Sequence, residues 1–500
     1  MTGSPRLLRL LAAPVLLLGA CTTVGPDFKR PDAPAGAADY TPPGEAKAAV
    51  VQLSPEARAA GPWWLAFRSE ALDRTVRLAL AESPDVAEAQ ATLERYQAAA
   101  SETAGERGVQ VEGTGNAARQ KFNSKSFGIK SGSTNSPFSS FGTRTFNLFS
   151  LGARVTYDLD LFGGERRRAE QAGARVEQAE READAAYLTL SASVALQAMR
   201  IAGLRDEIKA MEAIVEDDRT LLGLAHKALS IGGIPRTTLT GIEAQLAEDE
   251  AVLPPLRRQY DTARRQLALL AGRSPGDWTP PDFDLAQIAV PAQAPVSLPS
   301  ELVRRRPDIL AAEADLHAAT AAIGVAVADR YPALRLSANG SLSGLTPDDL
   351  FSPSSTGYTL ASGLTAPLFD GGARKARTRV AEAEARVSQA RYRRTVLKAF
   401  NEVSDAMAAL KTDEDEIAAL TRAVGHSQQL ADDTLAAARL GGRTAAEVIQ
   451  SRRQMDRDLR SLAEARARRL SDIVTLYAAS GADWREAQTA GGVGGVGPGR

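Results

Sequence analysis

Cys21 is the residue whose position most directly suggests a chemical modification. It is the only cysteine among 500 residues, and it follows residues 10–18, an apolar run too short to span a bilayer. The tetrapeptide LGAC that ends at Cys21 resembles a lipobox, in which cleavage leaves the cysteine as the first residue, with an S-diacylglycerol and an N-acyl group such as palmitate. We therefore expect a lipoprotein signal peptide at 1–20 and a lipidated N-terminal arm at 21–60. Thr22, in place of an Asp, fits export to the outer membrane.

Two Gly-Gly pairs mark the expected tips of two long helical hairpins, in the segments GGIPRTTLTGIE and GGRTAAEVIQ. A Thr-x-x-Glu pattern follows each pair and fits a capping box, which satisfies backbone donors at the start of the returning helix. Arg443 lies four residues before Glu447, so the two side chains can pair for a few tenths of a kcal/mol. The residues concerned are Gly232, Gly233, Thr240 and Glu243 in the first segment and Gly441, Gly442, Thr444 and Glu447 in the second.

The remaining polar residues form no pattern that predicts catalysis or metal binding. His226, His317 and His426 are scattered, no Ser-His-Asp arrangement can be argued, and no phosphate-cradling glycine loop precedes a lysine. Acidic and basic residues nearly balance, at 61 and 60, and no basic block suggests a nucleic-acid partner. The sequence therefore predicts neither an enzyme nor a cofactor, apart from the covalent lipid on Cys21.

Four segments alternate between polar and apolar residues and predict β-strands. A period of two over about ten residues indicates a strand, and this length suits a tilted transmembrane strand. In the third segment, for example, Leu334 and Leu336 fall on one face, and Arg335 and Ser337 on the other. The four segments are VQVEGTGNA, FSLGARVTYDLD, ALRLSANGSLSGL and GYTLASGLTAPLF.

Two long stretches without an internal proline, residues 165–230 and 373–440, predict the helices that carry the hairpin tips. In the first, apolar residues recur mostly every three or four positions, as in a coiled coil. A helix of ~65 residues is roughly 100 Å long and must lie against other helices to be stable. Gly163-Gly164 and Gly371-Gly372 stand where strand gives way to helix, and we assign them a structural role only.

The chain repeats its own pattern, which predicts an internal duplication. PDVAEAQATLERYQAAASETAGER aligns with PDILAAEADLHAATAAIGVAVADR, and LFGGERRRAEQAGARVEQAE aligns with LFDGGARKARTRVAEAEARVSQA. Each half should contain a helix that opens with Pro-Asp, a strand pair and a long hairpin. We expect a first repeat at 61–271, a linker or equatorial segment at 272–300, a second repeat at 301–484 and a disordered tail at 485–500.

Four strands cannot close a barrel, and an open sheet edge is not viable in lipid. If these strands enter a membrane, several chains must complete the barrel together. Two chains would supply eight strands around an interior filled by side chains, whereas three would supply twelve strands and leave a lumen.

The sequence resembles the TolC-like outer-membrane efflux proteins, also called outer membrane factors, and within them the NodT-type lipoproteins. The resemblance rests on CTTVGPDFKRP, GPWWLAFRSEALDRTVRLAL, RRRPDILAAEADLHAATAAIGVAVADRYP, FNEVSDAMAAL and the repeated LFGGERRRAE and LFDGGARKAR. It implies an α+β membrane protein: a homotrimer with a twelve-stranded outer-membrane β-barrel, four strands per chain, continuous with a twelve-helix α-barrel across the periplasm. It also implies a mixed equatorial domain built from 31–60, 272–300 and the chain end.

The resemblance further implies a channel that docks on a periplasmic adaptor and an inner-membrane pump to expel small molecules. Arg443, Glu447 and Gln450 match positions that form inter-subunit links and an acidic ring at the periplasmic aperture of the family. The glycine pairs of the two tips would face the adaptor. This chain has Gln450 at the family's second acidic position and Leu239 where an Asp is common, so any acidic gate should be weaker.

Two other classes of protein share part of this pattern. A periplasmic adaptor lipoprotein also has a lipid anchor and a long helical hairpin, but it has one hairpin beside halves of a small β domain. A structural or adhesive surface lipoprotein is the second alternative. Cys21→Ser would discriminate, since a conduit should still need detergent whereas an adaptor without its lipid should be soluble in water.

Overall fold

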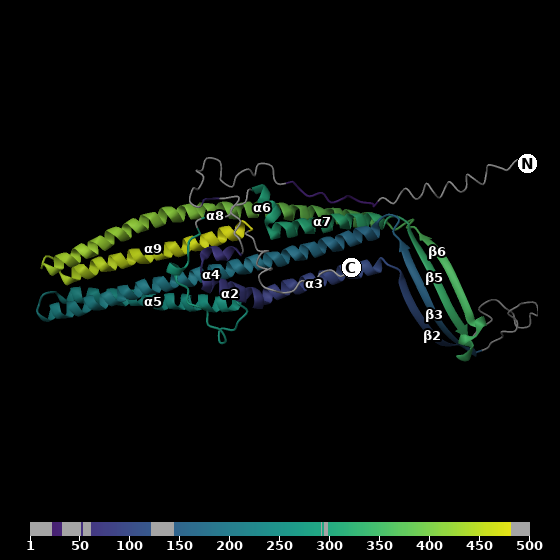
Figure 1. The fold of residues 1–500 in the computed structure, drawn as a ribbon, viewed down its shortest axis with the longest axis horizontal. Helices are drawn as coiled ribbons and strands as arrows, with labels where there is room; N and C mark the ends of the chain where they lie inside the picture. Colours follow the sequence, from purple (N-terminus) through teal and green to yellow (C-terminus); the bar gives the residue numbers. More distant parts are fainter. Residues whose placement is uncertain are drawn as a thin grey trace, which may run out of the picture. The chain divides into compact units, whose positions relative to one another are not determined.

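The computed structural model describes residues 23–32, 52–53, 62–121, 145–291, 293–294 and 299–481 (Figure 1). Cys21, residues 122–144 and the expected tail at 485–500 lie outside the described residues. The elements are β1 (Gln52–Leu53), η1 (Trp63–Phe67), α2 (Glu70–Glu82), α3 (Pro84–Glu106), β2 (Gln110–Lys121), β3 (Thr145–Leu159), α4 (Gly164–Ser230), α5 (Arg236–Leu270), η4 (Leu285–Gln287), β4 (Gln293–Ala294), α6 (Pro299–Arg305), α7 (Pro307–Ala328), β5 (Ala333–Gly344), η5 (Asp348–Phe351), η6 (Pro353–Ser355), β6 (Thr356–Thr365), α8 (Ala373–Arg439) and α9 (Ala445–Ala479).

The chain divides into two compact units, and each unit takes residues from both halves of the sequence. One unit comprises residues 1–30, 94–177 and 314–390, and the other comprises 31–93, 178–313 and 391–500. The first holds the long strands and the helix ends that adjoin them. The second holds the two helical hairpins and the short elements around Trp63.

The four predicted strands are confirmed and form one antiparallel sheet in the order β2-β3-β5-β6. Its register brings like residues into the same row over the middle of the sheet, so one face is mostly apolar and the other mostly polar. In the single chain the apolar face is exposed, with Val111 68% and Leu360 75% accessible. One row contains Val111, Val155, Ala338 and Leu360, and the next contains Glu112, Arg154, Asn339 and Thr359.

Each strand pair passes into its long helix through a glycine turn capped by an aspartate. Gly163 and Gly371 both have positive φ, 76° and 63°, which residues with a side chain rarely adopt. The Asp160 carboxylate accepts a hydrogen bond from the backbone N–H of Arg166 at 2.9 Å. Asp370 does the same for Arg374 at 3.0 Å, and these backbone donors lower the pKa of its carboxyl. The structural role expected for the glycine pairs is confirmed.

The two hairpins have helices of equal length. α4 and α8 each contain 67 residues, and α5 and α9 each contain 35. Both long helices match the predicted bounds within a residue or so. Where the hairpins pack together, Gly203 of α4 leaves no room for a side chain, because a Cβ there would lie 2.7 Å from the Ala467 Cβ of α9. The helices therefore approach closely at this level.

An aromatic core beside the hairpins accounts for the buried tryptophans. Trp63 is fully buried, stacks on Tyr477 with ring centroids 5.6 Å apart and donates its indole N–H to Ser191 at 3.2 Å. Arg306, just before α7, donates to the Ala479 carbonyl at 3.0 Å and pairs with Glu402 at 2.7 Å. These contacts join three helices that are far apart in sequence. Trp484 lies outside the described residues.

Short strands connect two of the segments expected in the equatorial region. β1 pairs with β4 in parallel, with Gln52 opposite Gln293 and Leu53 opposite Ala294. Ala289 donates its backbone N–H to the Phe67 carbonyl at 2.9 Å. Residues 52–53 and 293–294 therefore lie side by side.

α7 is the one helix, among the residues that the structure describes, long and apolar enough to cross a membrane by length and composition. Half of that stretch is buried. Gly324 within it packs so closely on the Arg167 side chain that a Cβ would lie 2.7 Å from the Arg167 Cγ. Its apolar character is thus explained by packing inside the protein.

Candidate functional site

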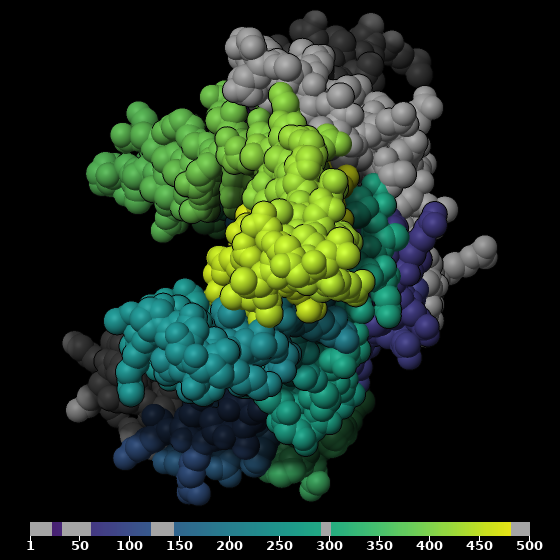
Figure 2. All heavy atoms as spheres, turned by 90° about the vertical axis from the view of Figure 1, so that its left-hand side faces the viewer, coloured from purple at the N-terminus to yellow at the C-terminus, as the bar shows by residue number. Residues whose placement is uncertain are grey.

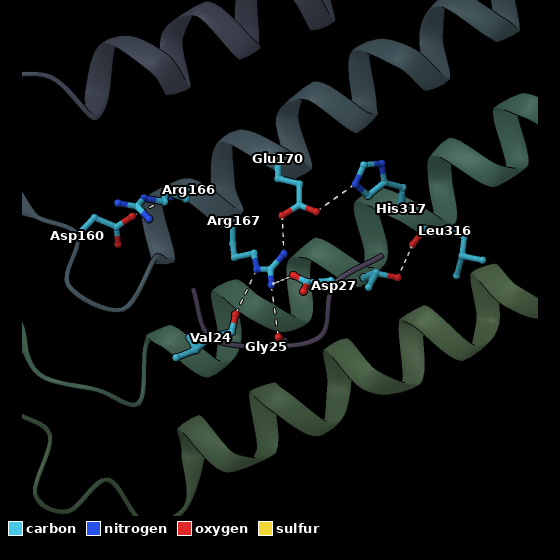
Figure 3. Close-up of polar contacts among 10 residues, drawn as sticks. Val24, Gly25, Asp27, Asp160, Arg166, Arg167, Glu170, Leu316 and His317 are labelled. Carbon is cyan, nitrogen blue, oxygen red and sulfur yellow. Dashed lines mark hydrogen bonds and ion pairs between the residues drawn. The ribbon is translucent and has the colours of Figure 1, made fainter. Parts of the chain in front are cut away.

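The segment Thr23–Phe28 that follows Cys21 is docked on α4 and α7 by one buried arginine (Figure 3). The Arg167 side chain is 4% exposed. Its Nε donates to the Val24 carbonyl at 3.2 Å, and Nη2 donates to the Gly25 carbonyl at 3.3 Å and to Asp27 Oδ1 at 2.7 Å. Its Nη1 donates to Glu170 Oε2 at 2.7 Å. We call residues 23–28 the docked segment.

A second set of contacts extends from Glu170 to the end of the docked segment. The His317 Nε2 atom lies 3.1 Å from Glu170 Oε1, and the Phe28 ring stacks on the imidazole with centroids 4.5 Å apart. His317 is therefore packed between Phe28 and Glu170. Burial acts to lower the pKa of Arg167, but hydrogen bonds to Glu170 and Asp27 outweigh it and raise the pKa.

Glycines allow the docked segment to lie directly on the backbone of its neighbours. Gly25 has φ +91°, and a Cβ there would lie 2.5 Å from the Gly324 Cα of α7. A Cβ on Gly163 would lie 2.8 Å from the Thr23 Cα. Val24 also donates its N–H to the Phe162 carbonyl at 3.1 Å. The segment is therefore fixed against the turn between β3 and α4.

The hairpin tips, the second site, are exposed and share one kind of helix end (Figure 2). Gly232 and Gly441 have φ of 75° and 79°. Gly233 donates to the Ala228 carbonyl at 2.8 Å, and Gly442 donates to the Ala437 carbonyl at 2.9 Å. This is the Schellman arrangement, in which a left-handed glycine closes the last turn of a helix. The glycine pairs therefore end α4 and α8 as predicted.

The second tip also has the predicted capping box. Thr444 is the N-cap of α9, and its Oγ1 accepts from the Glu447 N–H at 3.3 Å while Glu447 accepts from the Thr444 N–H at 2.8 Å. Arg443 pairs with Glu447 at 2.7 Å, as expected for this spacing. The Thr444 backbone N–H, then Arg443 and the Thr444 hydroxyl, lower the pKa of Glu447 to about 2.

The capping box predicted at the first tip is wrong. α5 begins at Arg236 with Pro235 as its N-cap and no side-chain cap, so Thr240 lies inside the helix. Its hydroxyl donates instead to the Arg236 carbonyl at 3.2 Å. In both tips two residues separate the glycine pair from the returning helix, and the second of them is the N-cap, so Pro235 occupies the position that Thr444 has in the second tip. Leu239, the substitute for a common Asp, is buried.

The structure places Arg443, Glu447 and Gln450 together at the exposed start of α9, within two helical turns. They thus occupy one end of the second hairpin. Cys21 lies outside the described residues, two positions before the docked segment.

Two of the buried arginines, Arg167 and Arg453, carry no signal in the local sequence. Arg167 lies in the run RRR, a pattern typical of an exposed helix face, and its partners in the docked segment are about 140 residues away in sequence. Arg453 lies between Asp218 and Asp249, and each of these aspartates is more than 200 residues away from it in sequence. No local pattern marks such long-range pairs.

Comparisons with known proteins agree with this architecture. A family model described as outer membrane efflux protein matches residues 75–273 and 298–482. The chain is 29% identical over 484 residues to the pyoverdine export outer membrane protein OpmQ of Pseudomonas putida, covering 96% of this chain and 98% of that protein. It is 26% identical over 482 residues to nodulation protein T of Rhizobium leguminosarum bv. viciae, covering 94% and 92%.

Among solved structures, the outer-membrane channel OprN superposes with a TM-score of 0.80 at 26% identity, covering 93% of this chain and all of that one. Members of the matched family are outer-membrane efflux channels that extend into the periplasm, and they are not enzymes. Since the family model spans most of the sequence in two segments, the chain belongs to the outer membrane efflux protein family.

Proposed function

We propose that three copies of this chain form a conduit that exports small molecules across the outer membrane and the periplasm. The observation that carries the proposal is the four-stranded sheet, whose register separates a wholly polar row from a wholly apolar row. An exposed apolar face suits contact with lipid, and a polar face suits a water-filled lumen. The family assignment supports both.

The edges of the sheet support assembly. Within the described residues β2 and β6 each have one strand partner, so the outer edge of each presents unpaired backbone groups. Joining β6 of one copy to β2 of the next would close the barrel, and three copies would supply twelve strands. The matched helix lengths of the hairpins support internal duplication and a tunnel of twelve helices.

Reconstitution tests the conduit. The purified protein, with Cys21→Ser to remove the lipid, should still need detergent and should insert into planar bilayers with stepwise currents. A water-soluble variant without currents would instead favour the adaptor or surface-lipoprotein alternatives.

We further propose that Cys21 carries the lipid and that the docked segment positions it. Cys21 is two positions from Thr23 in the sequence, and two extended residues span at most ~7 Å. Mass spectrometry of the mature N-terminus tests the lipid. Arg167→Met should release the docked segment and expose it to protease, whereas Arg166→Met, on the same helix, should leave it protected.

Arg443, Glu447 and Gln450 are proposed to line the periplasmic aperture, with Gly232, Gly233, Gly441 and Gly442 at the tips that an adaptor meets. Their exposure at the end of the second hairpin supports this. Arg443→Ala with Glu447→Ala should raise the closed-state conductance. An unchanged conductance would remove these residues from the gate.

The partners proposed are a periplasmic adaptor and an inner-membrane pump. The relatives named for pyoverdine and toluene export make small organic molecules the proposed cargo. Efflux should be lost on deletion of this gene and should return with the Cys21→Ser form if the lipid is an auxiliary anchor.

A further inference from the structure

The helices next to the sheet follow the order of its strands (Figure 1). α3 leads into β2, α4 follows β3, α7 leads into β5 and α8 follows β6. Gln90 of α3 donates to the Tyr187 hydroxyl of α4. Asp315 of α7 accepts from Arg175 of α4 at 2.9 Å and from Ser388 of α8 at 2.7 Å. Within the described residues, α3 and α8 therefore lie at the two ends of this row of helices, as β2 and β6 lie at the ends of the sheet.

α3 is almost uncovered in the single chain. Val86 is its one buried residue. Its counterpart α7 also begins with Pro-Asp, but it lies between two helices and fully buries Ile309, Ala318 and Ala321. Because a helix in water gains most of its stability from packing against other elements, α3 should have a second neighbour. The described residues of the single chain do not supply that neighbour.

The two helices at the ends of the row carry opposite charge. α3 contains five acidic residues and one basic residue. Residues 373–398 of α8 contain nine basic and two acidic residues. The equivalent stretch of α4, residues 165–190, already has neighbours on both sides and contains five basic and six acidic residues. The excess positive charge therefore belongs to the helix with a free flank.

The exposed cations of α8 form a stripe along the helix. Lys375, Arg379 and Arg386 are spaced by four and seven residues, which places them on one side, and all three are exposed. On α3, Glu94 and Glu102 are exposed as well. Within the part of the chain that the structure describes, no ion pair joins any of these five side chains to another residue. They are therefore available to a partner of opposite charge.

An existing junction inside the chain shows how such helices can meet. Arg175 of α4 pairs with Asp315 of α7 at 2.9 Å, and Arg168 of α4 pairs with Asp329, just after α7, at 3.2 Å. In the proposed duplication, α8 is the counterpart of α4, and α3 is the counterpart of α7. α8 of one copy beside α3 of the next would therefore repeat this junction, with the cations and the acidic residues on the same sides.

The same correspondence sets the level at which the two helices would meet. Arg167 and Lys375 occupy equal positions, because each follows the residue whose backbone N–H is capped by the turn aspartate. Ser101 and Gly324 each lie 17 residues after the proline that begins their helix. Since the Arg167 side chain lies directly against Gly324, Lys375 should lie level with Ser101 of the next copy, beside Glu102.

A second contact gives the level of Arg379. Inside the chain, His317 lies 3.1 Å from Glu170. Glu94 holds the position of His317, ten residues after the proline, and Thr378 holds that of Glu170, seven residues after the left-handed glycine. Arg379 follows Thr378 directly, so it should lie next to Glu94 of the next copy.

We propose that α8 of each copy packs along α3 of the next through an acid–base seam, in which Lys375 faces Glu102 and Arg379 faces Glu94. The seam rests on the proposed three-copy conduit, and it names the surface by which the copies recognise each other. Opposite charges favour the pairing of α8 with α3 over the pairing of either helix with itself. They therefore favour a head-to-tail arrangement of copies, which is the arrangement that can close into a ring of three.

Disulfide cross-linking tests the seam in outer membranes that contain the full chain. Lys375→Cys with Ser101→Cys, in the Cys21→Ser background that has no other cysteine, should give covalently linked dimers and trimers on oxidation with copper phenanthroline. Arg386→Cys with Ser101→Cys is the matched control, because Arg386 is on the same side of α8 but about 17 Å further along it. This control should remain monomeric on a denaturing gel. Equal cross-linking of both pairs, or a link within one chain, would overturn the proposal.

Charge exchange tests whether the seam drives assembly, with native mass spectrometry in detergent as the measure of trimer. Lys375→Glu with Arg379→Glu should lower the fraction of trimer by about tenfold or more, because like charges then face each other across the seam. Glu94→Lys with Glu102→Lys should do the same from the other side. The four substitutions together should restore the trimer, which also shows that neither pair of changes prevents folding.

A control on the opposite side of α8 separates the seam from the charge of the helix as a whole. Arg377→Glu with Arg391→Glu changes that charge by the same amount and should leave the trimer intact. If the stripe binds lipid phosphates instead, reversal on α3 will have no effect and the four substitutions will not restore assembly, and either result rejects the seam. A wild-type trimer whose Lys375 and Ser101 variants fail to cross-link also rejects the seam alone. A wild-type protein that forms neither trimers nor currents would instead reject the conduit.

Discussion

The two hairpin tips are built from similar residues and end differently. Their outgoing helices stop at the same left-handed glycine, Gly232 in one and Gly441 in the other. The returning helices begin differently, since Pro235 offers no side-chain cap and Thr444 forms a complete capping box with Glu447. The residue at the N-cap position, Pro235 or Thr444, therefore decides whether the returning helix has a side-chain cap. A suitable motif five residues later has no effect.

Substitution of the left-handed glycines should destabilise the tips more than any other change, and by the same amount in both tips. Replacing Gly232 or Gly441 by Ala forces a side chain into a left-handed backbone, at a cost of about 1–2 kcal/mol. Amide hydrogen exchange of the tips should accelerate about tenfold in each variant. A much smaller effect at one tip would mean that this tip does not hold the shared helix end.

Removing the cap should distinguish the tips. Thr444→Ala should cost about 1 kcal/mol and accelerate exchange at the start of α9, because the Glu447 N–H loses its acceptor. Thr240→Ala should change exchange in α5 by less than about 0.5 kcal/mol, since Thr240 lies within the helix. Equal losses in both would contradict the assigned helix starts.

A graft should make the first tip resemble the second. Pro235→Thr combined with Thr238→Glu places the box at the same distance from the glycine pair, and should slow exchange at the start of α5 by roughly 0.5–1 kcal/mol. The natural sequence already has a Thr-x-x-Glu pattern at Thr240 and Glu243, but this pattern lies inside α5 and forms no capping box. Thr238→Glu alone, without the threonine, serves as the control.

The smallest expected effect is that of pH, between 8 and 5, on the stability of the capping box at the second tip. The pKa of Glu447 is lowered, to about 2, so the stabilisation of the cap is complete above its ordinary pKa of 4.5 and is lost as the pH falls toward 2. Exchange at the second tip, corrected for its intrinsic pH dependence, should be flat from pH 8 to 5. Glu447→Gln should remove the loss at lower pH, and the first tip provides an internal reference.

Much of the fold could be predicted from local patterns. The strands follow from alternation such as Leu334-Arg335-Leu336-Ser337, and the ends of α4 and α8 follow from glycine pairs. The capping boxes were predicted alike, and only the one at Thr444 was confirmed. Sequence matching aligned Thr240 with Thr444, whereas the geometry of the turn aligns Pro235 with it.

The buried arginines could not be predicted in this way. Arg167 is recognised only once the docked segment lies against α4, and its neighbour Arg166 has the same side chain and is more exposed. Arg453 likewise follows Arg452 directly, and only packing decides which one is buried. In both cases two adjacent arginines differ only in their tertiary contacts. These contacts decide which one is buried, and the periodicity of the sequence does not reveal them.

The equal helix lengths also restrict which insertions and deletions the two hairpins can tolerate. One residue added to α8 alone would advance its tip by about 1.5 Å and rotate it by about 100° relative to α4. Arg453 would then miss Asp218, and the two tips would end at different levels. Tolerated insertions should therefore arrive in α8 and α9 together, in whole turns, and be matched by the same insertion in α4 and α5. We therefore expect the lengths of the four helices to change together, if they change at all, among related proteins.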